Sequence, residues 1–255
     1  MPASPEATGG IGYTFEGSVV ASYLTSLLVE GGARGLSEAV VDKISLQRKA
    51  LGEPLDDLIV MASDRYGRPA KLSLQVKQSP TLSAAETNVD FREVVAASWA
   101  EFQKTDFKQG RDRVGLAAAN IALTTLRPAH ATLEWARISN SAGDFFRRLE
   151  TEEFASDMQR KFVRDVRKLL PDGFRDDENT WRFLRHFVII VFGTLTEGAS
   201  CSFESTERLR STLTENERHR APELWVRLCQ ITRNASGVAG SFSRDTLLEQ
   251  LSGSL

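Results

Sequence analysis

The 255-residue sequence is poor in the residues that build covalent or metal-stabilised scaffolds. It has two cysteines, Cys201 and Cys229, which lie far apart, so neither a disulfide scaffold nor a cysteine-based zinc site is expected. Two buried or partly buried thiols are the expectation instead. The three histidines lack the His-x₃-His or His-x-His spacing of a zinc site: His130, His186 and His219.

Long hydrophobic runs and signal-peptide features are also missing. The most apolar window, Phe187–Phe192, has six residues, whereas a membrane-spanning helix needs roughly 20. Residues 1–6 have neither a basic start nor an apolar run. We therefore expect a cytoplasmic protein without a membrane partner.

No strong charge of either sign is present, because 32 basic residues stand against 34 acidic ones. A nucleic-acid partner would have to be held by local basic patches, since the global field is not attractive. Two clusters are candidates, and a solvated helix face paired with nearby acids explains the second equally well. They are Lys104, Lys108, Arg111 and Arg113, and then Arg160, Lys161, Arg164, Arg167 and Lys168.

Several nucleotide-binding and catalytic motifs are absent. The sequence has no Gly-x₄-Gly-Lys-Ser/Thr, so it does not bind ATP through a P-loop. Gly9-Gly10-Ile11-Gly12 precedes a helical pattern without a strand before it, so a dinucleotide-binding turn is not expected. The Gly-x-Ser-x-Gly motif of serine hydrolases is missing as well.

We expect three parts along the chain. Residues 1–12 form a flexible lead-in rich in Pro and Gly, residues 13–138 an α/β domain, and residues 139–255 a helical subdomain. In the α/β domain, periodicity predicts helices at 13–29, 89–103 and 126–137 and strands at 58–61, 71–77 and 114–121. Beyond it, helical patterns occupy 142–169, 178–196, 203–216, 221–234 and 244–251.

The sequence Gln75-Val76-Lys77 ends the strand-like run that begins at Lys71. Because alternate side chains of a strand share a face, Gln75 and Lys77 point the same way. The alternate apolar residues point into a core: Leu72, Leu74 and Val76. The residues from Asp64 to Pro69 have hairpin-turn chemistry, which folds this strand back toward Asp57.

These residue types suit a divalent cation that binds a phosphodiester. Hard oxygen ligands favour Mg²⁺, which keeps several waters and shares phosphate oxygens. Asp57 is the expected principal ligand, with the side-chain oxygen of Gln75 and the backbone carbonyl of Val76 beside it. Lys77 would orient the attacking water or stabilise the pentavalent phosphate, and Glu16 contributes if its helix packs beside the hairpin.

Simpler interpretations of the same residues stay open. A surface hairpin with Asp at one end and Gln and Lys on its wet face is common, and an acid such as Glu16 in the first turn of a helix is favoured by the helix dipole. Whether Asp56 joins Asp57 as a ligand is also undecided, because neighbouring side chains of an extended chain point apart.

The order of these elements resembles the PD-(D/E)XK, or restriction-endonuclease-like, superfamily in its variant with Gln in place of the second acid. Gly10-Ile11-Gly12-Tyr13-Thr14-Phe15-Glu16 and Leu72-Ser73-Leu74-Gln75-Val76-Lys77 are similar to bacterial antiphage effector nuclease domains. Such domains are fused to a nucleotide-sensing module or to a STAND-type ATPase. The resemblance implies a mixed sheet flanked by helices, followed here by an all-helical C-terminal part.

The resemblance also implies an activity. It places the metal-binding acid on Asp57, the Gln on Gln75, the lysine on Lys77 and the helix glutamate on Glu16. The expected function is a Mg²⁺- or Mn²⁺-dependent deoxyribonuclease that cuts double-stranded DNA with little sequence preference, as a homo-oligomer or fused to a regulatory module. The alternative is an inactive nuclease-like adaptor or oligomerisation module.

Overall fold

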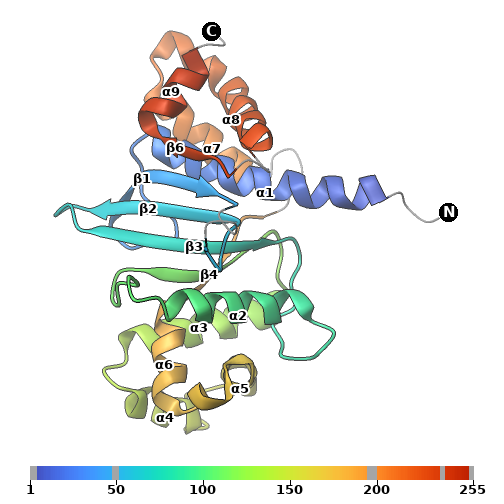
Figure 1. The fold of residues 1–255 in the computed structure, drawn as a ribbon, viewed down its shortest axis with the longest axis vertical. Helices are drawn as coiled ribbons and strands as arrows, with labels where there is room; N and C mark the ends of the chain where they lie inside the picture. The colour runs from blue at the N-terminus through green and yellow to red at the C-terminus, as the bar shows by residue number, and fades with distance from the viewer. Residues whose placement is uncertain (1–4, 48–51, 194–199, 236–238, 253–255) are drawn as a thin grey trace.

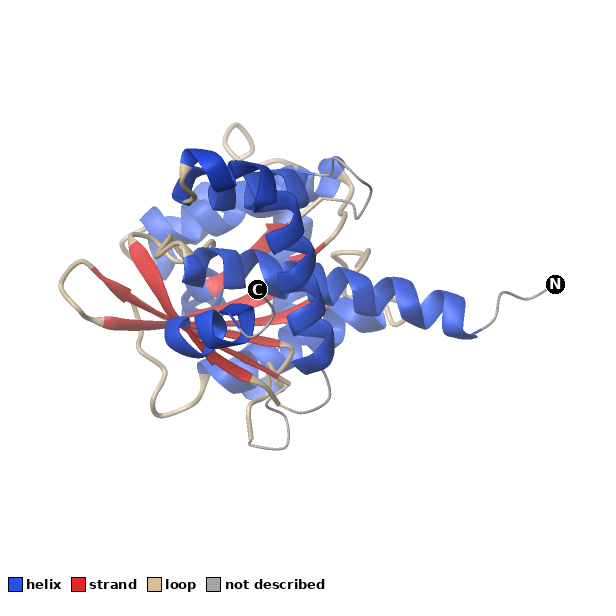
Figure 2. Cartoon of the chain, turned by 90° about the horizontal axis from the view of Figure 1, so that it is seen from above, coloured by secondary structure: helices blue, strands red, loops and turns tan. Residues whose placement is uncertain are grey.

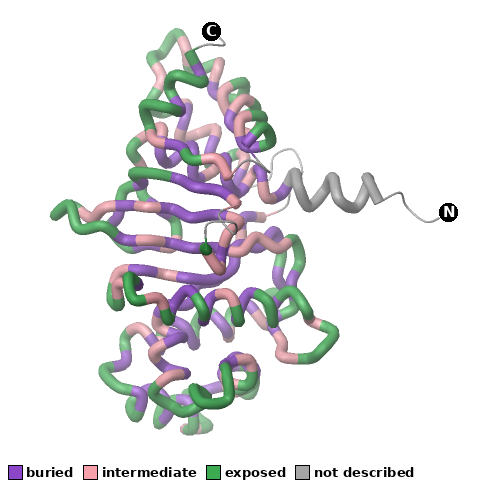
Figure 3. Tube along the Cα trace, in the orientation of Figure 1, coloured by how far each residue is buried: buried purple, intermediate pink, exposed green. Residues whose placement is uncertain are grey.

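The computed structural model describes residues 5–47, 52–193, 200–235 and 239–252, and it has three layers. A six-stranded sheet forms the middle layer, and helices cover both of its faces (Figure 1). The view from above, in Figure 2, shows the strands in the interior with helices around them. Buried residues accordingly concentrate along the strands in Figure 3.

The sheet is mixed, with strand order β5-β4-β3-β2-β1-β6. The antiparallel strands β1 (Ala39–Leu46), β2 (Leu58–Asp64) and β3 (Pro69–Lys77) are consecutive in the chain, and β6 (Ser241–Ser243) pairs antiparallel with β1. Strands β4 (Arg113–Ala118) and β5 (Phe187–Val191) extend the sheet from β3 in parallel. The carboxyl ends of β3, β4 and β5 therefore lie at one edge of the sheet.

One face of the sheet is covered by α1 (Pro5–Leu28), α7 (Ser200–Thr212), α8 (Ala221–Ala235) and α9 (Arg244–Ser252). From Phe15 onward α1 is apolar on most of its circumference, as expected of a helix between a sheet and other helices. The short helix η3 (Glu215–Arg220) leads into α8. Both cysteines lie in this layer, Cys201 buried and Cys229 partly buried, and both are free thiols as predicted.

The opposite face is covered by α2 (Val89–Phe102), α3 (Leu123–Ile138), α4 (Ala142–Glu150), α5 (Asp157–Leu169) and α6 (Asp177–His186). The short helix η2 (Asp172–Phe174) connects α5 to α6. These helices share a core rich in aromatic rings, in which Trp99 contacts both Phe102 and Phe183. None of the described helices combines the length and apolar character that a membrane crossing requires.

The predicted fold class, a mixed sheet flanked by helices, is confirmed, but its C-terminal part is not all helical. Residues 187–191 form β5, where the sequence predicted a helix over 178–196, of which 194–196 lie outside the described residues. A strand buried on both faces reads as a continuous apolar run, which periodicity cannot distinguish from a buried helix. Helix α1 also begins at Pro5, within the predicted lead-in, whose residues 1–4 are outside the described range.

Two local features set the geometry of the sheet. At the β2–β3 turn, the Asp64 carboxylate accepts hydrogen bonds from the backbone N–H groups of Tyr66 and Arg68, which confirms the predicted hairpin. In β4, a Cβ at Gly115 would lie 2.0 Å from the Val188 carbonyl oxygen. Only glycine allows β4 and β5 to approach this closely.

Candidate functional site

The predicted hairpin brings Asp57 and the end of β3 together. Asp57 immediately precedes β2, and its Oδ2 accepts a 2.6 Å hydrogen bond from Gln75 Nε2 and a 2.7 Å hydrogen bond from the Val76 backbone N–H. The register places Leu58, the first residue of β2, opposite Leu74, so the Asp57 contacts come just before β2 begins. The Asp57 carboxylate therefore accepts the Val76 N–H, which a backbone carbonyl would accept if β2 began earlier.

The Val76 backbone N–H indicates where the carbonyl proposed as a ligand lies. The N–H and C=O of a strand residue point to the same side. Since the Val76 N–H donates to Asp57, its carbonyl faces the same open end of β2. Gln75 presents its amide nitrogen to Asp57 in this arrangement, so a cation ligand at Gln75 requires the amide to turn.

Glu16 on α1 lies close enough to Asp57 for the two charges to interact. Burial raises the pKa of Asp57 to about 7, the Val76 hydrogen bond opposes this shift, and Glu16 and Asp56 add to it. The pKa of Glu16 is also raised, first by burial and then by Asp56, against a lowering hydrogen bond from Gln47. We call Glu16, Asp57, Gln75, Val76 and Lys77 the carboxylate site.

Asp56 contributes to the negative potential because the chain before β2 is bent rather than extended. Its charge acts on both Glu16 and Asp57, although an extended backbone would have directed it away from them. The sequence pattern could not decide this point, since the bend depends on how residues 52–57 pack.

Lys77 lies on the same strand face as Gln75 and is held by helix α2. Its Nζ lies 3.1 Å from Asp90 and 3.2 Å from Glu93. Partial burial acts to lower the pKa of Lys77, but hydrogen bonds to these two carboxylates raise it by more. The pKa of Lys77 is therefore above its ordinary value. Sequence reasoning missed both partners, although their i, i+3 spacing on the helix after Gln-x-Lys was a usable signal.

The donor set fits a divalent cation in part. Carboxylate, amide and carbonyl oxygens are the ligands that Mg²⁺ prefers. Burial first, and neighbouring carboxylates second, raise the pKa values of Glu16 and Asp57. Over the described ranges, however, no cluster of three or more His, Cys, Asp or Glu side chains has metal-site geometry. A cation here would rest on two carboxylates, with Val76 and Gln75 completing the set.

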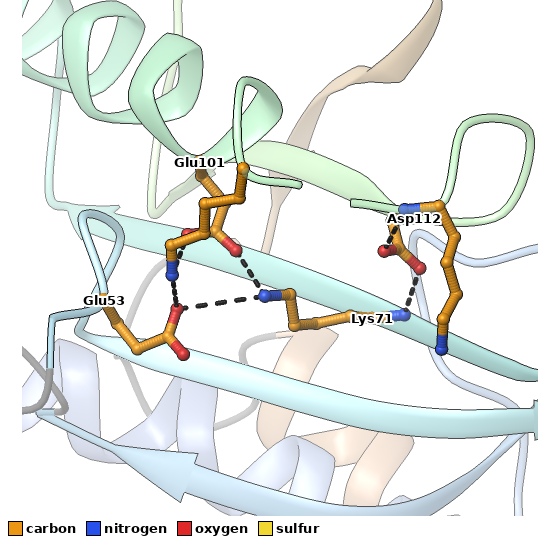
Figure 4. A network of polar contacts seen from close by, with 6 residues as sticks. Glu53, Lys71, Glu101 and Asp112 are labelled. Atoms are coloured by element: carbon orange, nitrogen blue, oxygen red, sulfur yellow. Dashed lines mark hydrogen bonds and ion pairs between the residues drawn. The ribbon is translucent and has the colours of Figure 1, made fainter. Parts of the chain in front are cut away.

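A buried ion network, shown in Figure 4, anchors the segment that leads to Asp57. Glu101 on α2 is fully buried and pairs with Lys71 on β3 and, at 3.0 Å, with Lys104. Lys104 in turn lies 2.5 Å from Glu53, four residues before Asp57. Asp112 fixes the start of β3 by accepting the Lys71 backbone N–H at 2.9 Å.

Both basic clusters proposed from sequence contain residues that form ion pairs within the protein. Lys104 belongs to the network of Figure 4. On α5, Arg160 pairs with Asp157 and Lys161 with Asp165, as in the alternative of a solvated helix face paired with acids. Neither cluster therefore presents a continuous track of unpaired charge.

Comparisons with known proteins give a structural match and no sequence match. No protein-family model matches the chain, and no curated protein matches it. A Cap4 SAVED/CARF-domain containing receptor from Moraxella osloensis superposes with a TM-score of 0.52 at 16% identity, over 96% of this chain and 47% of the receptor. This likeness establishes the fold.

Two receptor structures from Acinetobacter baumannii are similar and contain ligands. The Cap4 SAVED/CARF-domain containing receptor with the cyclic trinucleotide 3′3′3′-cAAA has a TM-score of 0.54, and the one with 2′3′3′-cAAA has 0.53. Both are 13% identical to this chain and match 96% of it and 45% of the receptor. The chain thus spans less than half of the length of these receptors.

The predicted effector DNA endonuclease is contradicted by this comparison. The proteins with the same fold are described as receptors with a SAVED/CARF domain and not as DNA endonucleases. Double-stranded DNA as the partner is contradicted too, since two of the receptors hold cyclic trinucleotides. Because both ligands carry phosphodiester groups, residue types chosen for one also suit the other.

Proposed function

We propose that this chain is a domain of a bacterial antiphage receptor that responds to a cyclic oligonucleotide. In this proposal its carboxylate site binds a divalent cation together with a phosphodiester group. The receptor assignment is supported by the shared fold with proteins that hold cyclic trinucleotides. The cation is an inference from the residues of this chain alone.

The observation that carries the cation is the state of Asp57. Its carboxylate is largely buried beside Glu16, and its pKa of about 7 means that charge is costly there. Both described hydrogen bonds fall on Oδ2, so in this proposal Oδ1 is the oxygen that binds the cation. A bound divalent ion would offset the repulsion between these acids and draw in phosphate oxygens, which the acids alone would repel.

The residues of the carboxylate site have separate roles in the proposed binding. Asp57 and Glu16 supply anionic oxygens, and the Val76 carbonyl supplies a neutral one on the same side. Lys77 on β3 provides a positive charge for the phosphodiester. Asp90 and Glu93 on α2 hold its ammonium group in place. Because the ligating carboxylates must be ionised, cation affinity should rise with pH across the pKa of Asp57.

The experiment is calorimetric titration of purified protein with 3′3′3′-cAAA, with Mn²⁺ or Mg²⁺ present or removed by a chelator. We expect cation-dependent binding that Asp57→Asn and Lys77→Ala weaken, whereas Lys43→Ala, at an exposed lysine of β1, leaves it unchanged. A linear trinucleotide tests whether the ring is recognised. Absence of cyclic trinucleotide binding, or cation-dependent cleavage of plasmid DNA that Lys77→Ala abolishes, would refute the proposal.

A second candidate function is enzymatic, namely metal-assisted hydrolysis of the bound phosphodiester. The observation that favours it is the ammonium of Lys77 on the strand face shared with Gln75, beside two carboxylates. A bound cation would polarise the phosphate and lower the pKa of a water molecule. Chromatography of the cyclic trinucleotide after incubation with Mg²⁺ tests this, and an intact ring in wild type and Lys77→Ala alike excludes it.

A further inference from the structure

A polar cleft lies on the free edge of β5, and its lining includes no residue of the carboxylate site. It has a volume of about 820 Å³ and lies between β5, helix α3 and residues 35–37. Arg113 lines this cleft together with Arg137, His130 and Glu134. Arg113 is the first residue of β4, whereas Lys77 pairs with Ala118 at the other end of that strand. Its walls are otherwise apolar and include Leu36, Leu133 and Val188.

The edge strand does not use this cleft to pair with another strand. The outward carbonyls of Phe187, Ile189 and Val191 accept hydrogen bonds from side chains. The donors are Arg137 at 2.9 Å, His130 at 2.9 Å and Arg34 at 2.8 Å. Two arginines are thereby fixed along the edge, and Arg137 also donates through Nη1 to Glu134 at 3.3 Å.

The positive charge in the cleft is poorly compensated. Arg113 donates to the backbone carbonyl of Asp112, and the ion pairs of the described residues include none with Arg113 or Arg185. Burial lowers the pKa of Arg113, the charges of Arg137 and Arg185 lower it further, and the charge of Asp112 opposes this shift without reversing it. Glu134 is the one carboxylate on the described lining, and it is mostly exposed and lies 3.3 Å from Arg137.

We propose that this cleft binds the phosphate group of a nucleotide-sized ligand through Arg113 and Arg137. Guanidinium groups match phosphate oxygens with paired hydrogen bonds, and several positive charges together favour a doubly charged anion over a single carboxylate. The volume lies within the range of about 300–1,000 Å³ typical of small-molecule sites. The apolar walls would contact the uncharged part of the ligand.

The proposal does not depend on the carboxylate site, and the test keeps the two sites apart. Inorganic phosphate, 5′-AMP and acetate are titrated into the full chain in the presence of a chelator, so that the carboxylate site holds no divalent cation. Asp57→Asn should leave binding unchanged. Arg113→Gln should weaken phosphate and AMP binding by about 10- to 100-fold, the usual cost of losing a hydrogen bond to a charged group.

The matched control is Arg147→Gln, at an arginine with 81% side-chain exposure on α4. Because Arg113 is half-buried, Ser37→Glu provides a second variant that places a carboxylate at the exposed mouth of the cleft, where it should repel phosphate without affecting folding. The proposal is overturned if wild type binds neither phosphate nor AMP, if acetate binds as tightly as phosphate, or if both variants bind like wild type.

Discussion

The buried ion network around Glu101 should make this single carboxylate important for stability. Glu101 has 0% side-chain exposure, and its partners Lys71 and Lys104 have 13% and 25%. Removing one member of a buried pair costs about 3–5 kcal/mol, since the other charge is left uncompensated. Glu53 still lies 3.8 Å from Lys71 and 2.5 Å from Lys104, so we expect Glu101→Gln to cost about 3 kcal/mol, at the lower end.

Urea unfolding followed by tryptophan fluorescence measures this loss directly. For a chain of this size, about 3 kcal/mol corresponds to a decrease in melting temperature of roughly 6–12 °C. The matched control is Glu207→Gln on α7, where Glu207 is 41% exposed and pairs with Arg210, and about 0–1 kcal/mol is expected. If Glu101→Gln costs no more than this control, the network does not stabilise the fold as argued.

Three further predictions concern protonation and packing. With a chelator present, neutral Asp57 contributes stability below its unfolded pKa near 3.8 that is lost as pH rises through about 7, so Asp57→Asn should stabilise the protein at pH 8 by up to about 4 kcal/mol. His186, which accepts the Gly110 N–H, has its pKa lowered by burial to about 4. Neutral His186 should contribute up to about 3 kcal/mol to the free energy of unfolding above pH 6.5, and this contribution should be lost as pH falls through 4. In His186→Gln, the dependence of stability on pH over this range should disappear. Urea titrations between pH 4 and 8 measure both, and a flat difference between variant and wild type contradicts either one. Gly115→Ala should cost about 3 kcal/mol or more by forcing β4 from β5, and a wild-type urea midpoint would contradict this.

Local sequence patterns predicted most of the elements around the site. Strand alternation placed Gln75 and Lys77 on one face, and Lys71 and Lys77, which have the same parity along β3, both contact α2. Turn chemistry at Asp64 predicted the hairpin that returns β3 to Asp57. Residues 187–191 were assigned wrongly, since an apolar run without flanking contrast fits a buried strand and a buried helix equally well.

The identity of the ligand was beyond the reach of these patterns. An acid, an amide and a lysine near one another are suited to any phosphodiester with a cation. The nuclease prediction therefore rested on resemblance, and the fold shared with cyclic-trinucleotide receptors contradicts it. Likewise, Arg113 was recognised as basic but not as part of a cleft, because His130, Arg137 and Ile189 come from distant parts of the chain.

The sequence by itself determined the alternation of β3, the hairpin turn and the amphipathic helices, because these depend on contacts between near neighbours in the chain. Only the tertiary structure decided how Glu16 on α1 meets Asp57, how α2 holds Lys77, and how Glu101 becomes fully buried. These three contacts join residues of helices on the two faces of the sheet to the sheet and its connecting segments. Their electrostatics follow from burial, which no local pattern specifies.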